Sequence, residues 1–189
     1  CAFRSDVRVT RIAHARGRVA GVDLADGRIS SHTVVLAAGA WSSLVEGSGL
    51  RRDAVRPARG QIVQVETRPP LLTHVVFAPR GYAVPRPDGR LLLGSTIEME
   101  GFKKQVTVDG MLALLSLGRE IAPDLGAAPV TETWAGFRPY TADELPILGA
   151  SHVRGLYICT GHFKSGIVLA PASADALRDL IVNGKAASD

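Results

Sequence analysis

Thr160 to Ile181 reads TGHFKSGIVLAPASADALRDLI, in which two glycines stand five residues apart ahead of a small-residue run and a leucine-bearing helix. The segment GHFKSG, residues 161–166, would bring the chain into that helix with much of its backbone bare. Amide N–H groups at a helix start have no partner within the helix, so they bind anionic or electron-rich ligand atoms. The stretch therefore predicts a ligand-binding turn before a helix from about Ser165 to Asn183, with Gly184 placed to end it.

The composition is that of an ordinary globular protein, with 46% hydrophobic and 21% charged residues among 189. The net charge is only +4 and 5% of the residues are aromatic, which argues against nucleic-acid binding, because such surfaces interleave basic and aromatic side chains. Much of the basic charge is expected in one loop-like run, at Arg51, Arg52, Arg56 and Arg59. No segment has the roughly 18 uncharged apolar residues of a membrane span, and no signal peptide opens the sequence. A cytoplasmic protein without a membrane span is expected.

The cysteines and histidines predict no metal site. Cys1 and Cys159 are too few and too far apart for a disulfide framework or a zinc site, and the five histidines lack metal-ligand spacing. Cys159 lies in an apolar run, where a buried, reduced thiol is expected. Gly161 and Gly166 mimic the frame of a P-loop, but apolar residues stand where that motif needs Lys and Ser or Thr, which excludes such a phosphate site.

Periodicity predicts an α+β fold, that is, a mixed α/β arrangement with an antiparallel sheet between two end segments that each carry a buried strand and a helix. Residues 8–24 read as an antiparallel meander, and 33–42 as an apolar strand, buried on both faces, that enters a glycine turn. A helix is expected over 108–121, capped by Thr107, although Gly110 and Gly118 weaken that prediction. Further strands are expected over 61–66, 82–85, 91–95, 131–137, 147–149 and 156–159.

Two side chains are candidates for substrate contact. Arg138 ends an apolar strand just before a proline, where a guanidinium could hold a carboxylate through two parallel hydrogen bonds. Pairing of Arg138 with a protein acid, Asp143 or Glu144, is an equally good alternative. Tyr82 offers a hydroxyl beside an apolar body, although a strand tyrosine is more often a packing residue.

Four blocks, TVVLAAGAWSS, YAVPRPDGRLLLGST, WAGFRPYTADELPILG and GHFKSGIVLAP, occur in the order seen in the D-amino-acid oxidase-like FAD-dependent flavoproteins. The sequence resembles that family over essentially its whole length, and within it is most similar to the glycine oxidases of thiamine biosynthesis. It matches only the back half or so of the family's chain, because the Gly-x-Gly-x-x-Gly start that holds the flavin pyrophosphate is absent. The resemblance implies a fragment: residues 1–50 as the remainder of a Rossmann-like FAD-binding domain, 51–140 as an antiparallel substrate-binding domain, and 141–189 as a return to the FAD-binding domain.

The resemblance also implies how FAD is held. Val9 would give backbone contacts to the adenine, and Ala38, Gly39 and Trp41 would lie along the dinucleotide, where glycine lets the backbone approach closely. The segment that opens the last helix would stabilise negative charge on the reduced isoalloxazine; its residues are Gly161, His162, Phe163, Lys164, Ser165, Gly166 and Ile167. The FAD would be non-covalent, since no cysteine lies near Arg138, and weakly held or absent in the fragment alone. Lys164 stands where relatives often have arginine, which leaves its role open.

The implied activity is that of an FAD-dependent oxidase. Arg138 would clamp the carboxylate of glycine or a similar small amino acid, with a hydrogen bond from Tyr82, while hydride passes from Cα to flavin N5 and oxygen is reduced to hydrogen peroxide. One alternative is a related flavin dehydrogenase of a 2-hydroxy acid or a secondary amine with another electron acceptor. The other is a flavin-free remnant with no activity alone. The family tends to form homo-oligomers, so a homo-oligomer is a further expectation.

Overall fold

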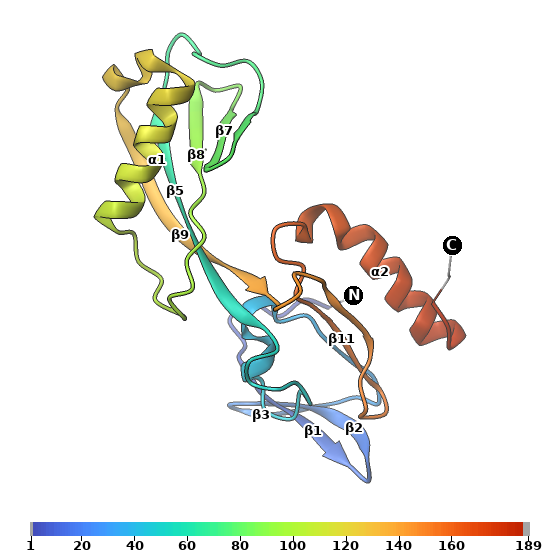
Figure 1. The fold of residues 1–189 in the computed structure, drawn as a ribbon. Helices are drawn as coiled ribbons and strands as arrows, with labels where there is room; N and C mark the ends of the chain where they lie inside the picture. Colours follow the sequence, from blue (N-terminus) through green and yellow to red (C-terminus); the bar gives the residue numbers. More distant parts are fainter. Residues whose placement is uncertain (1, 187–189) are drawn as a thin grey trace. The chain divides into compact units, whose positions relative to one another are not determined.

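The computed structural model describes residues 2–186, so Cys1 and the last three residues of the chain lie outside the described part. The chain forms two compact units: a discontinuous unit, built from the residues up to Pro57 and from Arg138 onward, and a central unit, Ala58–Phe137. Strands β5 (Arg56–Glu66) and β9 (Val130–Tyr140) carry the chain from one unit into the other (Figure 1). The predicted mixed α+β fold is confirmed.

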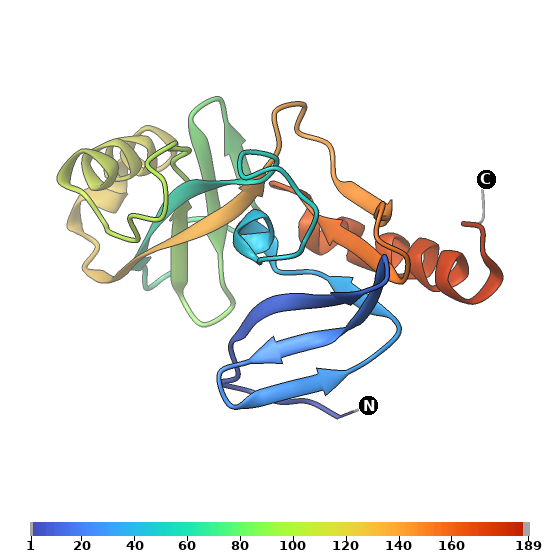
Figure 2. The ribbon, with the colours of Figure 1, turned by 90° about the horizontal axis from the view of Figure 1, so that it is seen from below.

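The discontinuous unit contains the predicted meander, in which β1 (Val9–Ala15), β2 (Arg18–Leu24) and β3 (Gly27–Ser30) pair antiparallel in that order (the blue strands of Figure 2). Two apolar side chains of this meander, Ile12 and Val19, are buried against residues from other parts of the same unit. The shared core cluster is Ile12, Val19, Leu36, Val153 and Leu156.

A second three-stranded sheet of the discontinuous unit has the order β10 (Ile147–Ala150), β11 (Leu156–Thr160), β4 (Val34–Leu36). Strand β11 pairs antiparallel with β10 and parallel with β4. The carboxyl ends of two parallel strands meet at the same edge of a sheet, which is where ligands bind in open α/β sheets. At this edge β4 leads into the 3-10 helix η1 (Gly39–Leu44), and β11 leads through the Gly161 turn into α2 (Gly166–Asn183).

The apolar strand predicted within 33–42 is present and enters a glycine turn as expected, but it is short and the prediction that it is buried on both faces is wrong. Strand β4 has three residues, and Val35 is 43% exposed. The chain leaves the extended conformation early because Gly39, with a φ of +55°, starts η1. Within the described part of the chain β4 pairs with β11 alone, so one edge and one face of an apolar strand stay open.

The central unit is a five-stranded sheet of order β6 (Val76–Ala78), β7 (Gly81–Pro85), β8 (Arg90–Gly94), β5, β9. Helix α1 (Val108–Ile121) and the 3-10 helix η2 (Pro123–Ala127) pack against it, and Figure 1 shows α1 alongside β8 and β5. Thr107 caps α1 as predicted, accepting a hydrogen bond from the Gly110 N–H. The core cluster is Val63, Val65, Ala83, Leu91, Leu93, Leu114 and Leu125.

The two glycines of α1 let the helix lie close to the sheet. A Cβ added at Gly110 would lie 2.4 Å from the Gln61 amide nitrogen, and one at Gly118 would lie 2.5 Å from Leu93 and Leu125 side-chain atoms. Glycine lowers helix propensity by about 1 kcal/mol, but here the loss is offset by close packing. The helix therefore forms despite the two residues that weakened its prediction.

The prediction that four arginines share one loop-like run is wrong for Arg56 and Arg59. Arg56 and Arg59 lie in β5, and Arg59 is only 3% exposed. The reason is a partner 39 residues away, Glu98, which neutralises the buried guanidinium. None of the described helices combines the length and apolar character needed to cross a membrane.

Candidate active site

Two of the predicted cofactor segments meet at the edge where β4 and β11 end. The Gly39 carbonyl accepts hydrogen bonds from the Ser42 hydroxyl at 2.8 Å and from the Thr160 hydroxyl at 2.9 Å. Both hydroxyl-bearing residues are buried, with 0% and 1% of their surface exposed. These bonds join the Gly39 turn to the residue before Gly161, although 121 residues separate Gly39 from Thr160.

Gly161 occupies a position that a side chain cannot share. Its φ is +79°, and an added Cβ would lie 2.8 Å from the Thr141 methyl group and 3.3 Å from the Ile147 nitrogen. A positive φ disfavours every residue with a Cβ, and the close neighbours add a steric conflict. Glycine at position 161 therefore lets the backbone of the turn after β11 lie close to Thr141 and to Ile147, the first residue of β10.

Phe163 is the point where the turn is attached to β9. Its φ is +46°, which is rare for a bulky residue, and its side chain is buried. The Phe163 N–H donates to the Pro139 carbonyl at 3.1 Å, and its ring meets the Tyr140 ring edge to face at 5.2 Å. The residue after Arg138 is thus hydrogen-bonded to the turn that opens α2.

A cation lies near each end of this aromatic pair. Lys164 Nζ is 4.8 Å from the centroid of the Phe163 ring, and Arg56 Cζ is 5.5 Å from that of Tyr140. Cations near an aromatic face are attracted by its quadrupole. Lys164 therefore has a structural contact, whether or not it also meets a ligand.

The start of α2 keeps its amides outward. Ser165 is the N-cap residue, and its side chain makes no capping hydrogen bond. The preceding turn is closed by the Ser165 N–H, which donates to the His162 carbonyl at 2.9 Å, while a His162 ring nitrogen lies 2.9 Å from the Ser173 hydroxyl. The first-turn residue Ile167 is 93% exposed. The start of α2 is therefore without a side-chain cap, and its binding of an electron-rich ligand atom stays a prediction.

Six of the predicted cofactor residues line two hollows, one on each face of β4, whereas Gly161, Phe163, Lys164, Ser165 and Ile167 line neither. A hollow of about 960 Å³ is lined by Val9, Ala38 and Trp41, together with Val34 and Leu36. A second hollow, of about 550 Å³, is lined by the alternate positions Val35, Ala37 and Gly39, and by Pro139, His162 and Gly166. Neighbouring residues of a strand face opposite sides, so one short strand contributes to both hollows. Arg138 is not among the residues that line either one.

Cys159 also lines the second hollow. It is a free cysteine that is half-buried, whereas full burial was expected. Burial raises the pKa of the Cys159 thiol, so the thiol stays protonated near neutral pH and is a poor nucleophile.

The two substrate candidates, Arg138 and Tyr82, belong to different units. Arg138 is half-buried in β9, one residue before the carbonyl that binds Phe163. Tyr82 is half-buried in β7, opposite Gly94 of β8 and Phe77 of β6. The Tyr82 ring lies against Gly94: a Cβ added there would be 2.9 Å from a ring carbon and 3.0 Å from the hydroxyl.

Sequence reasoning missed the hydroxyls that hold the two turns together. Ser42 follows Gly39 by three residues, the spacing of a side chain that bonds back to a 3-10 turn, so a local signal for it exists. Thr160 and Ser173 have no such signal, because their partners are set by the packing of β11 against β4 and of the Gly161 turn against α2.

Comparison with known proteins places this geometry in a family. The profile of the family described as "FAD dependent oxidoreductase" matches residues 1–180. The glycine oxidase of Pseudomonas putida is 38% identical over 186 residues, which are 97% of this chain and 50% of that protein. The bifunctional protein ThiO/ThiG of Trichormus variabilis is 39% identical over 183 residues, 95% of this chain and 27% of that protein.

The crystal structure of glycine oxidase from Bacillus cereus ATCC 14579 superimposes with a TM-score of 0.87 at 35% identity, covering 96% of this chain and 51% of that one. The chain thus spans about half the length of the glycine oxidases it matches.

Proposed function

Since the chain belongs to the FAD dependent oxidoreductase family, we propose that it forms the substrate-binding part and a portion of the FAD-binding part of an oxidase acting on glycine or a similar small amino acid. Relatives of 38% and 35% identity that carry the name glycine oxidase support this substrate class. A place in thiamine biosynthesis, supported by the similarity to a bifunctional ThiO/ThiG protein, belongs to the same proposal.

The residues present fit FAD. Gly39 has a positive φ and no atom within 4 Å of where its Cβ would stand, and Gly161 leaves its turn without a side chain. A flat, extended and partly anionic dinucleotide needs three features that occur here. They are bare backbone at these two turns, hollows on both faces of β4, and a helix start without a side-chain cap. We assign Val9, Ala38 and Trp41 to one part of the cofactor and the segment 161–167 to its ring system.

FAD bound there would supply the acceptor for the hydride that leaves the substrate Cα, and dioxygen would take up the electron pair as hydrogen peroxide. The contribution of this chain is orientation and charge. The Arg138 guanidinium holds the substrate carboxylate through two parallel hydrogen bonds, which fixes the direction of the Cα–H bond. Tyr82 donates a further hydrogen bond to the carboxylate, and the amides that open α2 stabilise the negative charge that develops on the cofactor.

One observation carries the proposal: the 3.1 Å hydrogen bond from Phe163 to Pro139 attaches the turn assigned to the flavin to the residue that follows Arg138. The carboxylate clamp and the flavin segment are therefore held by one contact within one unit. Orientation of a substrate against a cofactor requires such a fixed spacing, because a small displacement of reacting groups lowers the rate strongly.

The test uses the full-length protein that contains this chain. We expect hydrogen peroxide to form in a one-to-one ratio with the glycine consumed. We also expect Arg138→Ala to raise the KM for glycine by about two to three orders of magnitude, because loss of one partner of a hydrogen-bonded charge pair costs about 2–5 kcal/mol, while the affinity for FAD changes little.

Two results would count against this proposal in different ways. Glycine oxidation without peroxide would indicate a flavin dehydrogenase that uses another acceptor. An unchanged KM in the Arg138→Ala protein would remove Arg138 from the substrate site and favour its pairing with a protein acid.

A further inference from the structure

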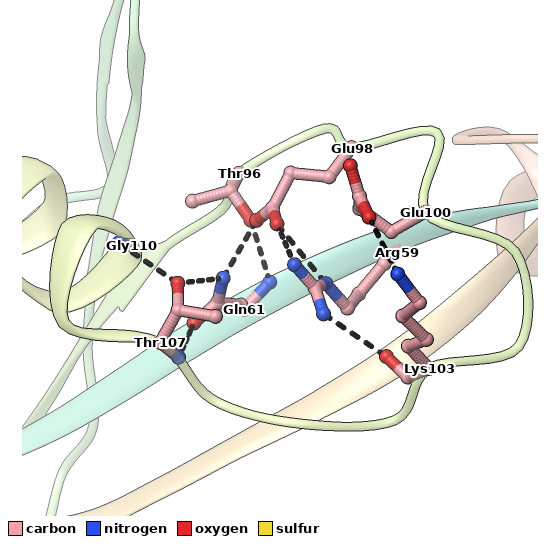
Figure 3. A network of polar contacts seen from close by, with 8 residues as sticks. All are labelled: Arg59, Gln61, Thr96, Glu98, Glu100, Lys103, Thr107 and Gly110. Carbon is pink, nitrogen blue, oxygen red and sulfur yellow. Dashed lines mark hydrogen bonds and ion pairs between the residues drawn. The ribbon is translucent and has the colours of Figure 1, made fainter.

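The central unit contains a buried ion pair that the proposed chemistry does not use. The Arg59 guanidinium donates to the Glu98 carboxylate from Nε, at 3.0 Å, and from a terminal nitrogen, and donates to the Lys103 carbonyl at 3.1 Å (Figure 3). The side chains of Arg59 and Glu98 are only 4% and 24% exposed. Such a pair gains little net stability over apolar side chains of the same size, because two charges lose their hydration. Its main effect is to fix geometry.

The pair belongs to a network that ties the segment 95–107 to β5. The Gln61 side-chain nitrogen Nε2 donates to Glu98 at 2.7 Å and to the Thr107 hydroxyl at 3.0 Å, and the side-chain oxygen Oε1 accepts from the Thr107 N–H at 2.8 Å. The Gln61 N–H donates to the Thr96 hydroxyl at 2.9 Å, and that hydroxyl also bonds to Glu98. The backbones of Arg59 and Glu98 exchange hydrogen bonds of 2.8 and 2.9 Å. The segment is therefore attached near its beginning, in its middle and at its end.

The segment 95–107 adjoins two other parts of the central unit, Gly94 beside Tyr82 and Phe137 of β9. Upstream, the segment begins directly after Gly94, against which the Tyr82 ring and hydroxyl lie. Downstream, Phe102 of the segment meets Phe137 edge to face at 5.4 Å, and Phe137 precedes Arg138 in β9. A shift of the segment would move the surface under the Tyr82 hydroxyl and the packing of Phe137 in β9.

We propose that Arg59 and Glu98 are positioning residues for the Tyr82 hydroxyl assigned to the substrate carboxylate, because their network fixes the segment 95–107, which begins directly after Gly94, the residue against which the Tyr82 ring lies. The proposal rests on the proposed function, since it assigns the network to the same site. It adds Arg59 and Glu98, which are not assigned to contact with the substrate or the cofactor and which would act through the segment 95–107.

The experiment compares Glu98→Gln with Glu120→Gln in the full-length protein. Glu120 forms an ion pair with Arg80 in the same unit, but the two side chains are 59% and 63% exposed, so the same chemical change is made without breaking a buried network. Thr96→Val is a milder second variant that removes one hydroxyl contact to Glu98, and it is used if Glu98→Gln does not fold. The readouts are KM and kcat for glycine, the affinity for FAD, and hydrogen exchange of residues 95–107.

We expect Glu98→Gln to raise the KM for glycine about tenfold or more, with kcat and FAD affinity within about twofold of the parent. This pattern is expected because the variant displaces a group assigned to bind the substrate carboxylate and leaves the cofactor residues unchanged. Residues 95–107 exchange faster in this variant, and Glu120→Gln changes none of these quantities. An unchanged KM, or a KM that changes only in step with FAD affinity, would reduce the network to a stability element and overturn the proposal.

Failure of the proposed function gives a different result. If the parent protein does not oxidise glycine, acetate serves as a carboxylate probe, with its dissociation constant read from the perturbed flavin spectrum. Weaker acetate binding in Glu98→Gln but not in Glu120→Gln would then support the positioning role. Equal acetate binding in all three proteins would overturn it.

Discussion

Gly94 shows how much a single missing side chain can decide. Its backbone lies across from Tyr82 in the β7–β8 pair, and the Tyr82 phenol occupies the space that a Cβ would take. In a sheet, facing side chains compete for the same volume. The orientation of a hydroxyl assigned to the substrate therefore depends on a residue that carries no chemistry.

We predict that Gly94→Ala raises the KM for glycine of the full-length protein about tenfold to a hundredfold, since the added methyl group displaces the Tyr82 hydroxyl. Steady-state kinetics measure the change, and Gly126→Ala is the control, because a Cβ at Gly126 makes only ordinary contacts of 3.7 Å or more. If both variants keep the parent KM, Tyr82 does not contact the substrate.

Helix α1 illustrates how secondary-structure elements override local preference. Gln61 is fully buried, and its amide lies where a Cβ of Gly110 would be. Three hydrogen bonds to Glu98 and Thr107 hold this amide in place. The helix can approach β5 only with glycine at this position.

We predict that Gly110→Ala lowers the free energy of unfolding by about 1–2 kcal/mol, because overpacking costs about 1–3 kcal/mol and exceeds the gain in helix propensity of about 1 kcal/mol. Urea unfolding followed by circular dichroism measures the difference. Ser116→Ala, an exposed substitution in the same helix, should be neutral or slightly stabilising. A more stable Gly110→Ala protein would contradict the close packing of α1 on β5.

The network on β5 also predicts a pH dependence of stability. Burial acts to raise the pKa of the Glu98 carboxyl, but the hydrogen bonds from Thr96, Arg59 and Gln61 together outweigh it, so the pKa lies below its usual value. A carboxyl whose pKa is lower in the folded state stabilises that state above its unfolded-state pKa, and this contribution disappears as the pH falls through the folded-state pKa.

We predict that Glu98→Gln lowers the free energy of unfolding by about 3–5 kcal/mol at neutral pH, since it leaves a buried guanidinium without its counter-charge. The difference from the parent should shrink as the pH is lowered from the ordinary carboxyl range through the folded-state pKa. Denaturant titrations at several pH values test this, with Glu120→Gln as the exposed control, for which about 1 kcal/mol or less is expected. A difference that stays constant into acid would show that the carboxylate charge is not the cause.

The chain as a whole covers about half the length of its glycine oxidase relatives. Strand β4 has an open edge within the described residues, and apolar side chains such as Val35, Trp41 and Leu44 are 43–55% exposed around it. The sequence also lacks a Gly-x-Gly-x-x-Gly turn for a pyrophosphate. The residues that we assign to FAD thus occur in this sequence without the motif that anchors the pyrophosphate.

We predict that the purified 189-residue chain does not retain FAD through gel filtration, whereas the full-length protein elutes with flavin absorbance. The expected loss follows from the missing pyrophosphate site, because contacts to the ring and adenine alone hold a dinucleotide weakly. Stoichiometric flavin in the isolated chain would contradict this and would show that the two hollows beside β4 suffice.

The sequence by itself determined the local elements. These elements depend on residues close in the chain. They include the Thr107 cap of α1, the end of α2 at Gly184, and the meander of β1 and β2, and the four blocks of the family are equally local. Periodicity and capping act between near neighbours, so they can be read without a fold. The common task of Arg138 and the Gly161 turn is implied by the resemblance that these blocks carry, and it stays a prediction.

Only the tertiary structure decided which distant groups meet. The bonds from Thr160 to Gly39, from Phe163 to Pro139 and from Arg59 to Glu98 each join residues that no spacing rule connects. A buried arginine and an exposed one look alike in a sequence, because burial and pairing are properties of the packed elements. For the same reason the open face of β4 cannot be predicted from the sequence, because an apolar strand indicates that its side chains need packing partners but not which elements supply them.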